Sequence, residues 1–250
     1  SMALKLKDNS MHLGSTKTRH SRNFTYIKGT VEATHLETYG EYKQKEINLL
    51  SNLLSSNEGQ TVIYDVGAGV GVHAMAFSKL GNVIAFEADE DQYKVLDMNT
   101  KGKLAPHVLA VKGSLETTDV EDSNIPNFDH QMMKLPPPTL VRMSGDSAKV
   151  LLGMRTTLTV IKPVIYIDIH NTQDVSYQYS ILKEKGYELY WYSCVDFNEN
   201  NYKKNLVNTT NNSFNMNILA IHKDVDIDDG AMDLPRIDGP LDNWKRFIND

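Results

Sequence analysis

Three glycines alternate with small residues directly after a short run rich in β-branched residues. The segment reads Asp-Val-Gly-Ala-Gly-Val-Gly over residues 65–71. Glycine lets the backbone turn tightly and approach a ligand without an intervening Cβ, and the helix predicted next would present unpaired N–H groups to a carboxylate or phosphate. The fingerprint of nicotinamide and flavin sites requires glycine at the sixth loop position, where this sequence has Val72. The loop therefore departs from that fingerprint.

An acidic residue closes the strand predicted next along the chain. Glu87 ends the segment Asn-Val-Ile-Ala-Phe-Glu, and a carboxylate at this position can accept hydrogen bonds from both hydroxyls of a ribose. The glycine loop alone is also compatible with a structural turn, since many such turns carry glycine. Loop and acid together predict a nucleoside-containing cofactor, with the structural turn as the alternative.

Three titratable residues lie at the ends of the strands predicted at 139–145 and 163–170. Asp168 and His170 are two residues apart on one strand and therefore share a face, while Asp146 follows the preceding strand. A carboxylate beside an imidazole raises its basicity and fixes its tautomer. His170 is the predicted general base, and Asp168 and Asp146 are the other catalytic candidates. The alternative for His170 is a strand-end histidine bonded to the backbone.

These residues are positioned by strands and helices that alternate from residue 40 onward. Short β-branched runs predict buried strands, and apolar residues at helical spacing predict helices. The strands are predicted at 61–67, 82–89, 107–113, 139–145, 163–170, 187–193 and 215–223, and the helices at 42–54, 72–80, 90–100, 147–161 and 175–186. This alternation is typical of an α/β fold with a largely parallel sheet. Ligands of such sheets bind at the carboxyl ends of the strands.

Two polar segments interrupt the alternation. Residues 116–138 finish with three prolines, which fit neither a helix interior nor a central strand, so we expect a long loop. Residues 198–212 are dominated by Asn and Lys and join the last two strands. Because amides hydrogen-bond well to hydroxyls, this segment is either a lid over a substrate or an exposed hairpin tip.

The spacing Gly-x-Gly-x-Gly after Asp65 is similar to the first motif of the S-adenosylmethionine (SAM)-dependent methyltransferases. More specifically, roughly residues 39–223 resemble the FkbM-type branch of the class I enzymes. The resemblance rests on the segments VIYDVGAGVG, VIAFEAD, HVLAVKG, VLLGM and PVIYIDIH. It implies the class I methyltransferase, Rossmann-like α/β fold, in which a seven-stranded, mostly parallel sheet has an antiparallel last strand and helices on both faces.

The resemblance also implies a function and a cofactor site. Members of this branch are associated with O-methylation of hydroxyls on sugars and sugar-bearing natural products, with SAM as donor and S-adenosylhomocysteine (SAH) as product. The acceptor expected here is therefore a saccharide or another small molecule, and Ser114 is at the position where this fold contacts adenine. The positions implied to bind the cofactor are Asp65, Gly67, Ala68, Gly69, Gly71, Glu87, Ala88 and Ser114.

One motif departs from the family pattern. The fourth strand usually ends in Asp-x-Glu-Gly, but here Arg142 stands at the Asp and Ser144 at the Glu. Either Asp146 supplies the acid or the acidic function is missing. Because Mg²⁺ needs several carboxylates, we expect no obligatory metal. There are two alternatives to an O-methyltransferase of saccharides. One is an inactive scaffold that binds the cofactor, and the other is a methyltransferase of another small metabolite or of a protein.

The composition excludes several classes of protein. A net charge of −6 argues against a protein whose main role is to bind nucleic acid, and a hydrophobic content of 40% argues against a disordered chain. No window approaches the roughly 18 consecutive apolar residues of a membrane helix. The single cysteine, Cys194, cannot form an internal disulfide, so we expect a reducing compartment and a cytoplasmic protein.

The chain is expected to have three parts. Residues 1–38 form a basic N-terminal arm, of which Ser1 and Met2 resemble a remnant of cloning. Residues 39–223 form the methyltransferase domain, and residues 224–250 form an acidic C-terminal tail.

Overall fold

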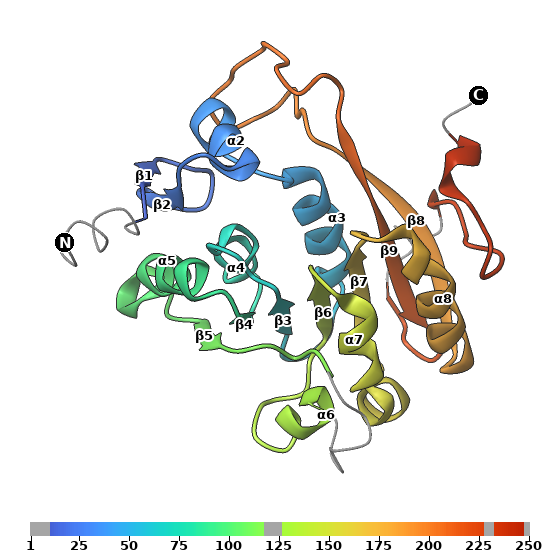
Figure 1. Ribbon diagram of the computed structural model, residues 1–250. Helices are drawn as coiled ribbons and strands as arrows, with labels where there is room; N and C mark the ends of the chain where they lie inside the picture. The colour runs from blue at the N-terminus through green and yellow to red at the C-terminus, as the bar shows by residue number, and fades with distance from the viewer. Residues whose placement is uncertain (1–10, 118–126, 228–232, 248–250) are drawn as a thin grey trace, which may run out of the picture.

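A seven-stranded sheet forms the centre of the computed structural model, which describes residues 11–117, 127–227 and 233–247 (Figure 1). The strands lie in the order β5-β4-β3-β6-β7-β9-β8. Their bounds are β3 (Val62–Val66), β4 (Asn82–Glu87), β5 (Val108–Lys112), β6 (Leu140–Met143), β7 (Val164–Asp168), β8 (Tyr187–Val195) and β9 (Phe214–His222). The first five strands of this order are parallel, and β9 is antiparallel to both of its neighbours. The predicted fold class is confirmed.

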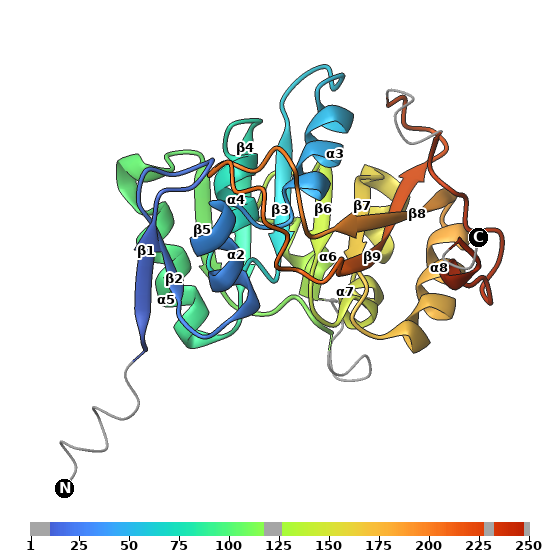
Figure 2. The same cartoon turned by 90° about the horizontal axis from the view of Figure 1, so that it is seen from above.

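Helices cover both faces of the sheet (Figures 1 and 2). One face carries α2 (Val31–Tyr39), α3 (Gln44–Leu54), α4 (Val72–Phe77) and α5 (Glu90–Thr100). The other face carries α6 (Asn127–Gln131), α7 (Ser147–Leu152) and α8 (Val175–Glu184). Because both faces are covered, β3 and β7 are buried along their whole length, which explains their continuous apolar character.

The prediction of one continuous helix at 147–161 is wrong, because the structure interrupts it after Leu152. Helix α7 ends at Leu152 and is followed by Gly153, and a π-helical turn, η2 (Thr157–Ile161), begins separately. The side chain of Asp129 in α6 accepts hydrogen bonds from the backbone N–H groups of Thr156 and Thr157, at 2.8 and 2.9 Å. This carboxylate satisfies the free N–H groups at the start of the second helical segment. Helix α6 itself lies inside the predicted 116–138 loop, of which residues 118–126 are outside the described part.

The described part of the predicted N-terminal arm packs onto the helices. Strands β1 (Leu13–Thr16) and β2 (Phe24–Ile27) form an antiparallel pair. The Asn99 amide in α5 both accepts from and donates to the backbone of Thr25, at 2.9 and 2.8 Å, while Phe24 and Leu36 are buried in the core. Helix α2 is capped by Thr30, whose hydroxyl accepts from the Ala33 N–H at 3.0 Å. The sequence did not predict these three elements.

The Asn-rich segment (residues 198–212) is bound to α2 and to Glu41, two residues beyond the end of that helix. The Tyr39 hydroxyl donates to the Val207 carbonyl at 2.8 Å and accepts from the Thr209 N–H at 2.9 Å. The Glu41 carboxylate accepts from the Tyr202 N–H at 2.6 Å and from the Arg19 guanidinium at 2.7 Å. These bonds hold the segment across the top of the molecule in Figure 1.

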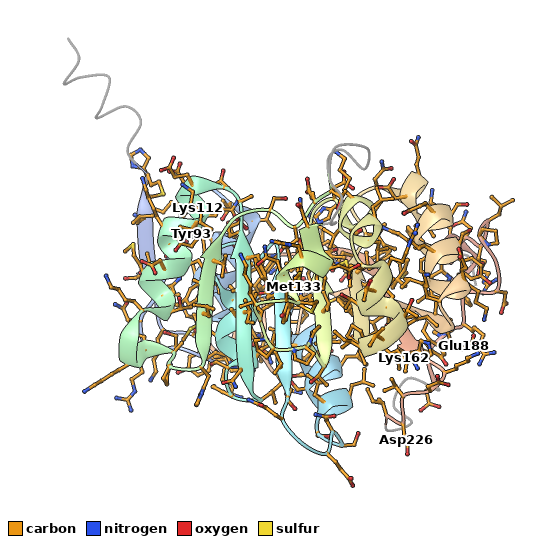
Figure 3. The ribbon with its side chains drawn as sticks, turned by 90° about the horizontal axis from the view of Figure 1, so that it is seen from below. Tyr93, Lys112, Met133, Lys162, Glu188 and Asp226 are labelled. Carbon is orange, nitrogen blue, oxygen red and sulfur yellow. The ribbon has the colours of Figure 1, made fainter. Side chains whose placement is uncertain are left out.

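The two edges of the sheet carry charged side chains. Lys112 lies on edge strand β5 and Glu188 on edge strand β8, at opposite ends of the view in Figure 3. Charges on edge strands discourage pairing with another chain. Within the described residues, no helix has the length and apolar character required to cross a membrane.

Candidate functional site

A cavity of about 270 Å³ is lined by residues at the carboxyl ends of β3, β4, β5 and β6. This volume is close to the lower end of the range for small-molecule pockets, which begins at roughly 300 Å³. The predicted site residues that line it are Gly67, Glu87, Ala88, Ser114 and His170. Those that do not line it are Asp65, Ala68, Gly69, Gly71, Asp168 and Asp146. We call it the strand-end cavity.

The glycine loop crosses directly against the end of β6. Gly67 has a φ of +79°, and a Cβ added there would overlap the carbonyl oxygen of Ser144. Gly69 has a φ of +58°, in the left-handed region that favours glycine. The sequence therefore needs glycine at both positions to bring the backbone to the cavity wall.

Glu87 is fixed in the cavity wall by two backbone groups. One carboxylate oxygen accepts from the Gly69 N–H and the other from the Asp89 N–H, each at 2.8 Å. A carboxylate oxygen has two lone pairs, so each oxygen can accept a further bond from a ligand. A hydrogen bond thus joins Glu87 to the glycine loop, the two features that the sequence analysis considered together.

Asp65 lies behind the loop in a buried ion pair. Its Oδ1 accepts from Nη1 of Arg142 at 2.9 Å, and Nε of Arg142 lies 3.7 Å from Oε2 of Glu46 in α3. Burial opposes the charge of Arg142, but the carboxylates of Asp65 and Glu46 outweigh it and raise the pKa of the guanidinium. Arg142, which stands where the resemblance implies an acid, is therefore a cation with partners on β3 and α3.

Asp168 is held by two side chains from distant parts of the chain. Its Oδ2 accepts from Nζ of Lys43 at 2.7 Å, and its Oδ1 accepts from the Asn215 amide at 2.9 Å. Burial alone would raise the pKa of Asp168, but the charge and hydrogen bond of Lys43 lower it. Asp168 is consequently an ionised carboxylate with both oxygens engaged.

Lys43 breaks two local rules at the start of α3. Its φ of +53° lies in the left-handed region, and it places a cation at a helix N-terminus, where the helix dipole disfavours positive charge. Burial would lower the pKa of Lys43, but Asp168 and Glu46 raise it. Unfavoured backbone conformations cluster at functional sites, and Lys43 contacts Asp168, so Lys43 is a candidate site residue that the sequence reasoning missed.

His170 lies at the mouth of the strand-end cavity and is more than half exposed. Its Nε2 is 3.3 Å from Oγ of Ser144 and 3.8 Å from Oδ2 of Asp168. The structure therefore brings two of the three predicted catalytic residues together. The third, Asp146, is the N-cap of α7, where it accepts from the Lys149 N–H at 3.3 Å. Asp146 is engaged in capping and does not line the cavity.

Glu32 is a second candidate that the sequence reasoning missed, because it lies in the segment predicted as a basic N-terminal arm. The residue is half-buried, and its carboxyl interacts electrostatically with Arg142, Lys43, Asp65 and Glu87. Burial raises its pKa to about 7, and the two cations only partly offset this effect. Helix α2 thus adds an acid to the charged cluster around Arg142. Asn215 was missed as well, and no local pattern distinguishes it from the chain's other asparagines.

The lining of the strand-end cavity fits a nucleoside-containing ligand. The Glu87 carboxylate can accept ribose hydroxyls, the Ser114 hydroxyl can both donate and accept, and the backbone at Gly67 is open to close approach. Across residues 11–117, 127–227 and 233–247, no three His, Cys, Asp or Glu side chains are grouped so that they could hold a metal ion.

Comparison with known proteins gives structural matches only. No family model matches the chain. No curated protein matches it either. A precorrin 8w decarboxylase from Methanobacterium thermoautotrophicum is 13% identical and has a TM-score of 0.51, over 71% of this chain and 89% of that one. At this identity the likeness bears on the fold alone.

Two further solved structures are similar at lower TM-scores. A precorrin-6y C5,15-methyltransferase from Geobacter metallireducens is 17% identical, with a TM-score of 0.49 over 72% of this chain and 88% of that one. The methyltransferase FkbM from Methylobacillus flagellatus is 16% identical, with a TM-score of 0.43 over 68% of this chain and 47% of that one. The seven-stranded sheet with its antiparallel β9 matches the class I methyltransferase fold, and these two matches add no argument about the branch.

Proposed function

We propose that this protein is a SAM-dependent O-methyltransferase of the FkbM type, which acts on a hydroxyl of a saccharide or glycosylated small molecule. The observation that carries the proposal is that Glu87 and His170 line the same cavity at one edge of the sheet. Glu87 and Gly67 of the glycine loop line the strand-end cavity, and exposed His170, with Asp168 3.8 Å away, lines it as well. A nucleoside site and a candidate base are thereby adjacent.

The cofactor would be held by residues of the strand-end cavity. Glu87 would accept the ribose hydroxyls, Ser114 would contact the adenine, and the backbone at Gly67 would approach the amino-acid part. Bound SAM supplies a methyl group on a positively charged sulfur. The task of the chain is then to hold an acceptor hydroxyl in line with that methyl group, since positioning is the main source of rate in such a displacement.

His170 would take the proton from the acceptor hydroxyl. A neutral hydroxyl is a poor nucleophile, and a positioned base contributes roughly 10²–10⁴-fold in rate. Asp168 lies 3.8 Å from the imidazole and stays ionised because Lys43 and Asn215 hold it. This carboxylate stabilises the imidazolium that forms as the proton moves. Lys43 and Asn215 are therefore positioning residues that act through Asp168.

A small neutral acceptor suits the charges of the chain better than a nucleic acid does. The net charge is −6, whereas binding to phosphate backbones depends on clustered Lys and Arg. Two cations of the charged cluster behind the cavity are already paired, Lys43 with Asp168 and Arg142 with Asp65. Among the residues described, no Lys or Arg lines the strand-end cavity, so its lining offers no cation to an anionic acceptor.

The test is an acceptor screen with product detection. The protein is incubated with SAM and a panel of glycosides, and SAH is measured together with the mass of the acceptor. We expect SAH to accumulate with at least one glycoside, whose mass rises by one methylene group. SAH binding without turnover on any glycoside, metabolite or protein acceptor would contradict the proposal and favour an inactive cofactor-binding scaffold.

We expect the reaction to proceed without an added metal. Arg142 and Ser144 stand where the resemblance places acids, so the carboxylate cluster that Mg²⁺ requires is incomplete. Incubation with EDTA followed by desalting should leave the rate of SAH formation unchanged. A loss of activity that Mg²⁺ restores would contradict this expectation.

A further inference from the structure

A second cavity, of about 340 Å³, shares no lining residue with the strand-end cavity. It is formed between the start of α8, strand β8 and residues 240–245. The C-terminal turn η5 (Trp244–Phe247) lies beside α8 in both views (Figures 1 and 2). We call it the tryptophan cavity, because Trp191 and Trp244 both line it.

Three neutral polar side chains of the tryptophan cavity have no partner within the described chain. Thr172, Gln173 and Ser176 line it, and their side chains make no hydrogen bond to another described residue. Trp191, a residue only 2% exposed, also lines the cavity. Hydroxyl and amide groups are suited to ligand hydroxyls.

The rest of the lining combines apolar side chains with Asp242, Asn243 and Lys245. Trp244 is half-buried and packs edge-on against Phe214, with ring centroids 5.8 Å apart, and Leu241 is largely exposed. Asp242 is paired with Arg246 at 2.7 Å. A ring with one apolar face and a rim of hydroxyls matches these walls, because carboxylate, amide and ammonium groups also hydrogen-bond to hydroxyls.

The tryptophan cavity is also close to the proposed catalytic edge. Thr172 follows His170 by two residues, so their Cα atoms are at most roughly 7 Å apart. His170 lines the strand-end cavity and Thr172 lines the tryptophan cavity. A chain of two or three sugar rings could therefore occupy the tryptophan cavity and present a neighbouring ring to His170.

We propose that the tryptophan cavity is a saccharide-binding subsite that holds a ring next to the one presented at His170. This inference deepens the proposed function and rests on it for the reaction, but not for binding. Thr172, Gln173 and Ser176 bond to the ring hydroxyls, and Trp244 covers its apolar face.

The chain offers a direct readout, because it has two tryptophans and both line this cavity. Tryptophan emission is followed while maltotriose, cellotriose, mannotriose or triacetylchitotriose is added to about 10 mM, ten times the Kd of a millimolar site. We expect a saturable change with at least one trisaccharide. The double substitution Gln173→Ala and Ser176→Ala should raise that Kd about tenfold, since each lost hydrogen bond costs about 0.5–1.5 kcal/mol.

The matched control is the double substitution Gln60→Ala and Ser180→Ala, at exposed positions outside the cavity, which should leave the Kd unchanged. A folded protein whose emission responds to none of the four trisaccharides, or only to adenosine, overturns the proposal. So does a response that is equal in both double variants. SAH binding is measured calorimetrically on the same samples. SAH binding without a saccharide response overturns the subsite alone, whereas a saccharide response without SAH binding overturns only the methyltransferase function.

Discussion

His170 has two polar neighbours that differ in how they can act on it. Ser144 lies 3.3 Å from Nε2 and is near enough to hydrogen-bond, while Asp168 lies 3.8 Å from the same nitrogen and acts through its charge. Because the imidazole is more than half exposed, an acceptor can displace Ser144 at Nε2. This geometry suits a base that faces a ligand, and it argues against a histidine bonded only to backbone.

Replacing His170 with Ala should lower the methylation rate at least about a hundredfold, the contribution expected of a general base. SAH affinity should persist, because Glu87 and the glycine loop remain. The matched control is His107→Ala, at an exposed position away from both cavities. Rates come from SAH formation at saturating SAM, and an unchanged rate in His170→Ala would discard the assignment.

Glu32 should make the stability of the protein depend on pH near neutrality. Its pKa is about 7 in the folded protein against an ordinary 4.5, so the folded state binds more protons between these values. The stabilisation is complete below pH 4.5 and is lost as the pH rises through 7. The groups whose charges act on this carboxyl are Arg142, Lys43, Asp65 and Glu87.

The substitution Glu32→Gln should therefore stabilise the protein relative to wild type at pH 8 and not at pH 5. For a partly exposed carboxyl we expect about 1–2 kcal/mol, measured by urea unfolding at both pH values. Glu58→Gln, at an exposed position, should show no such difference. Equal stability of Glu32→Gln and wild type at pH 8 would show that Glu32 is ionised there without cost.

At the scale of elements, β6 is joined to its surroundings by Arg142. The guanidinium connects β6 to Asp65 on β3 and to Glu46 on α3, and all three side chains are buried. Because Lys43 is the N-cap of α3, this ion pair also helps to place Lys43 against Asp168. Arg142, which stands where the resemblance implies an acid, thus has a structural role.

Replacing Arg142 with Met should destabilise the protein by about 3–5 kcal/mol, because two buried carboxylates lose their counter-charge. Arg142→Lys should fall between this variant and wild type, since lysine keeps the charge but not the planar fork. Arg155→Met, at an exposed position, is the matched control. Thermal unfolding compares them, and an Arg142→Met protein as stable as the Arg155→Met protein would contradict the role assigned to the ion pair.

The elements that the sequence predicted best are the strands that are buried on both faces. Strands β3 and β7 are buried on both faces, so their apolar runs identify them without knowledge of their neighbours. The break after Gly153 depends on Asp129, a residue from another helix, and no local pattern reveals it. Glu32 and Lys43 reach the site only because α2 and α3 pack over the sheet, so their part in it follows from tertiary structure.

At the scale of the whole molecule, the proposed catalytic edge draws on segments from most of the chain. Lys43 and Asn215 meet at Asp168 although they are far apart in sequence, and the Asn-rich segment is tied to Tyr39 and Glu41. We propose that the functional unit begins with the β1–β2 pair and α2, and not at residue 39. The class I sheet provides the frame, and its N-terminal additions complete the site.

The central claim is that the strand-end cavity binds SAM, and thermal unfolding with and without SAH tests it most directly. A ligand at 100 times its Kd adds about 2.7 kcal/mol of stability, which is a shift of roughly 5–10 °C for a chain of this size. We predict this shift for wild type and for Glu90→Ala, a neighbour of the cavity that does not line it. Glu87→Gln should lose most of it. No shift at millimolar SAH, or a full shift in Glu87→Gln, would contradict the account.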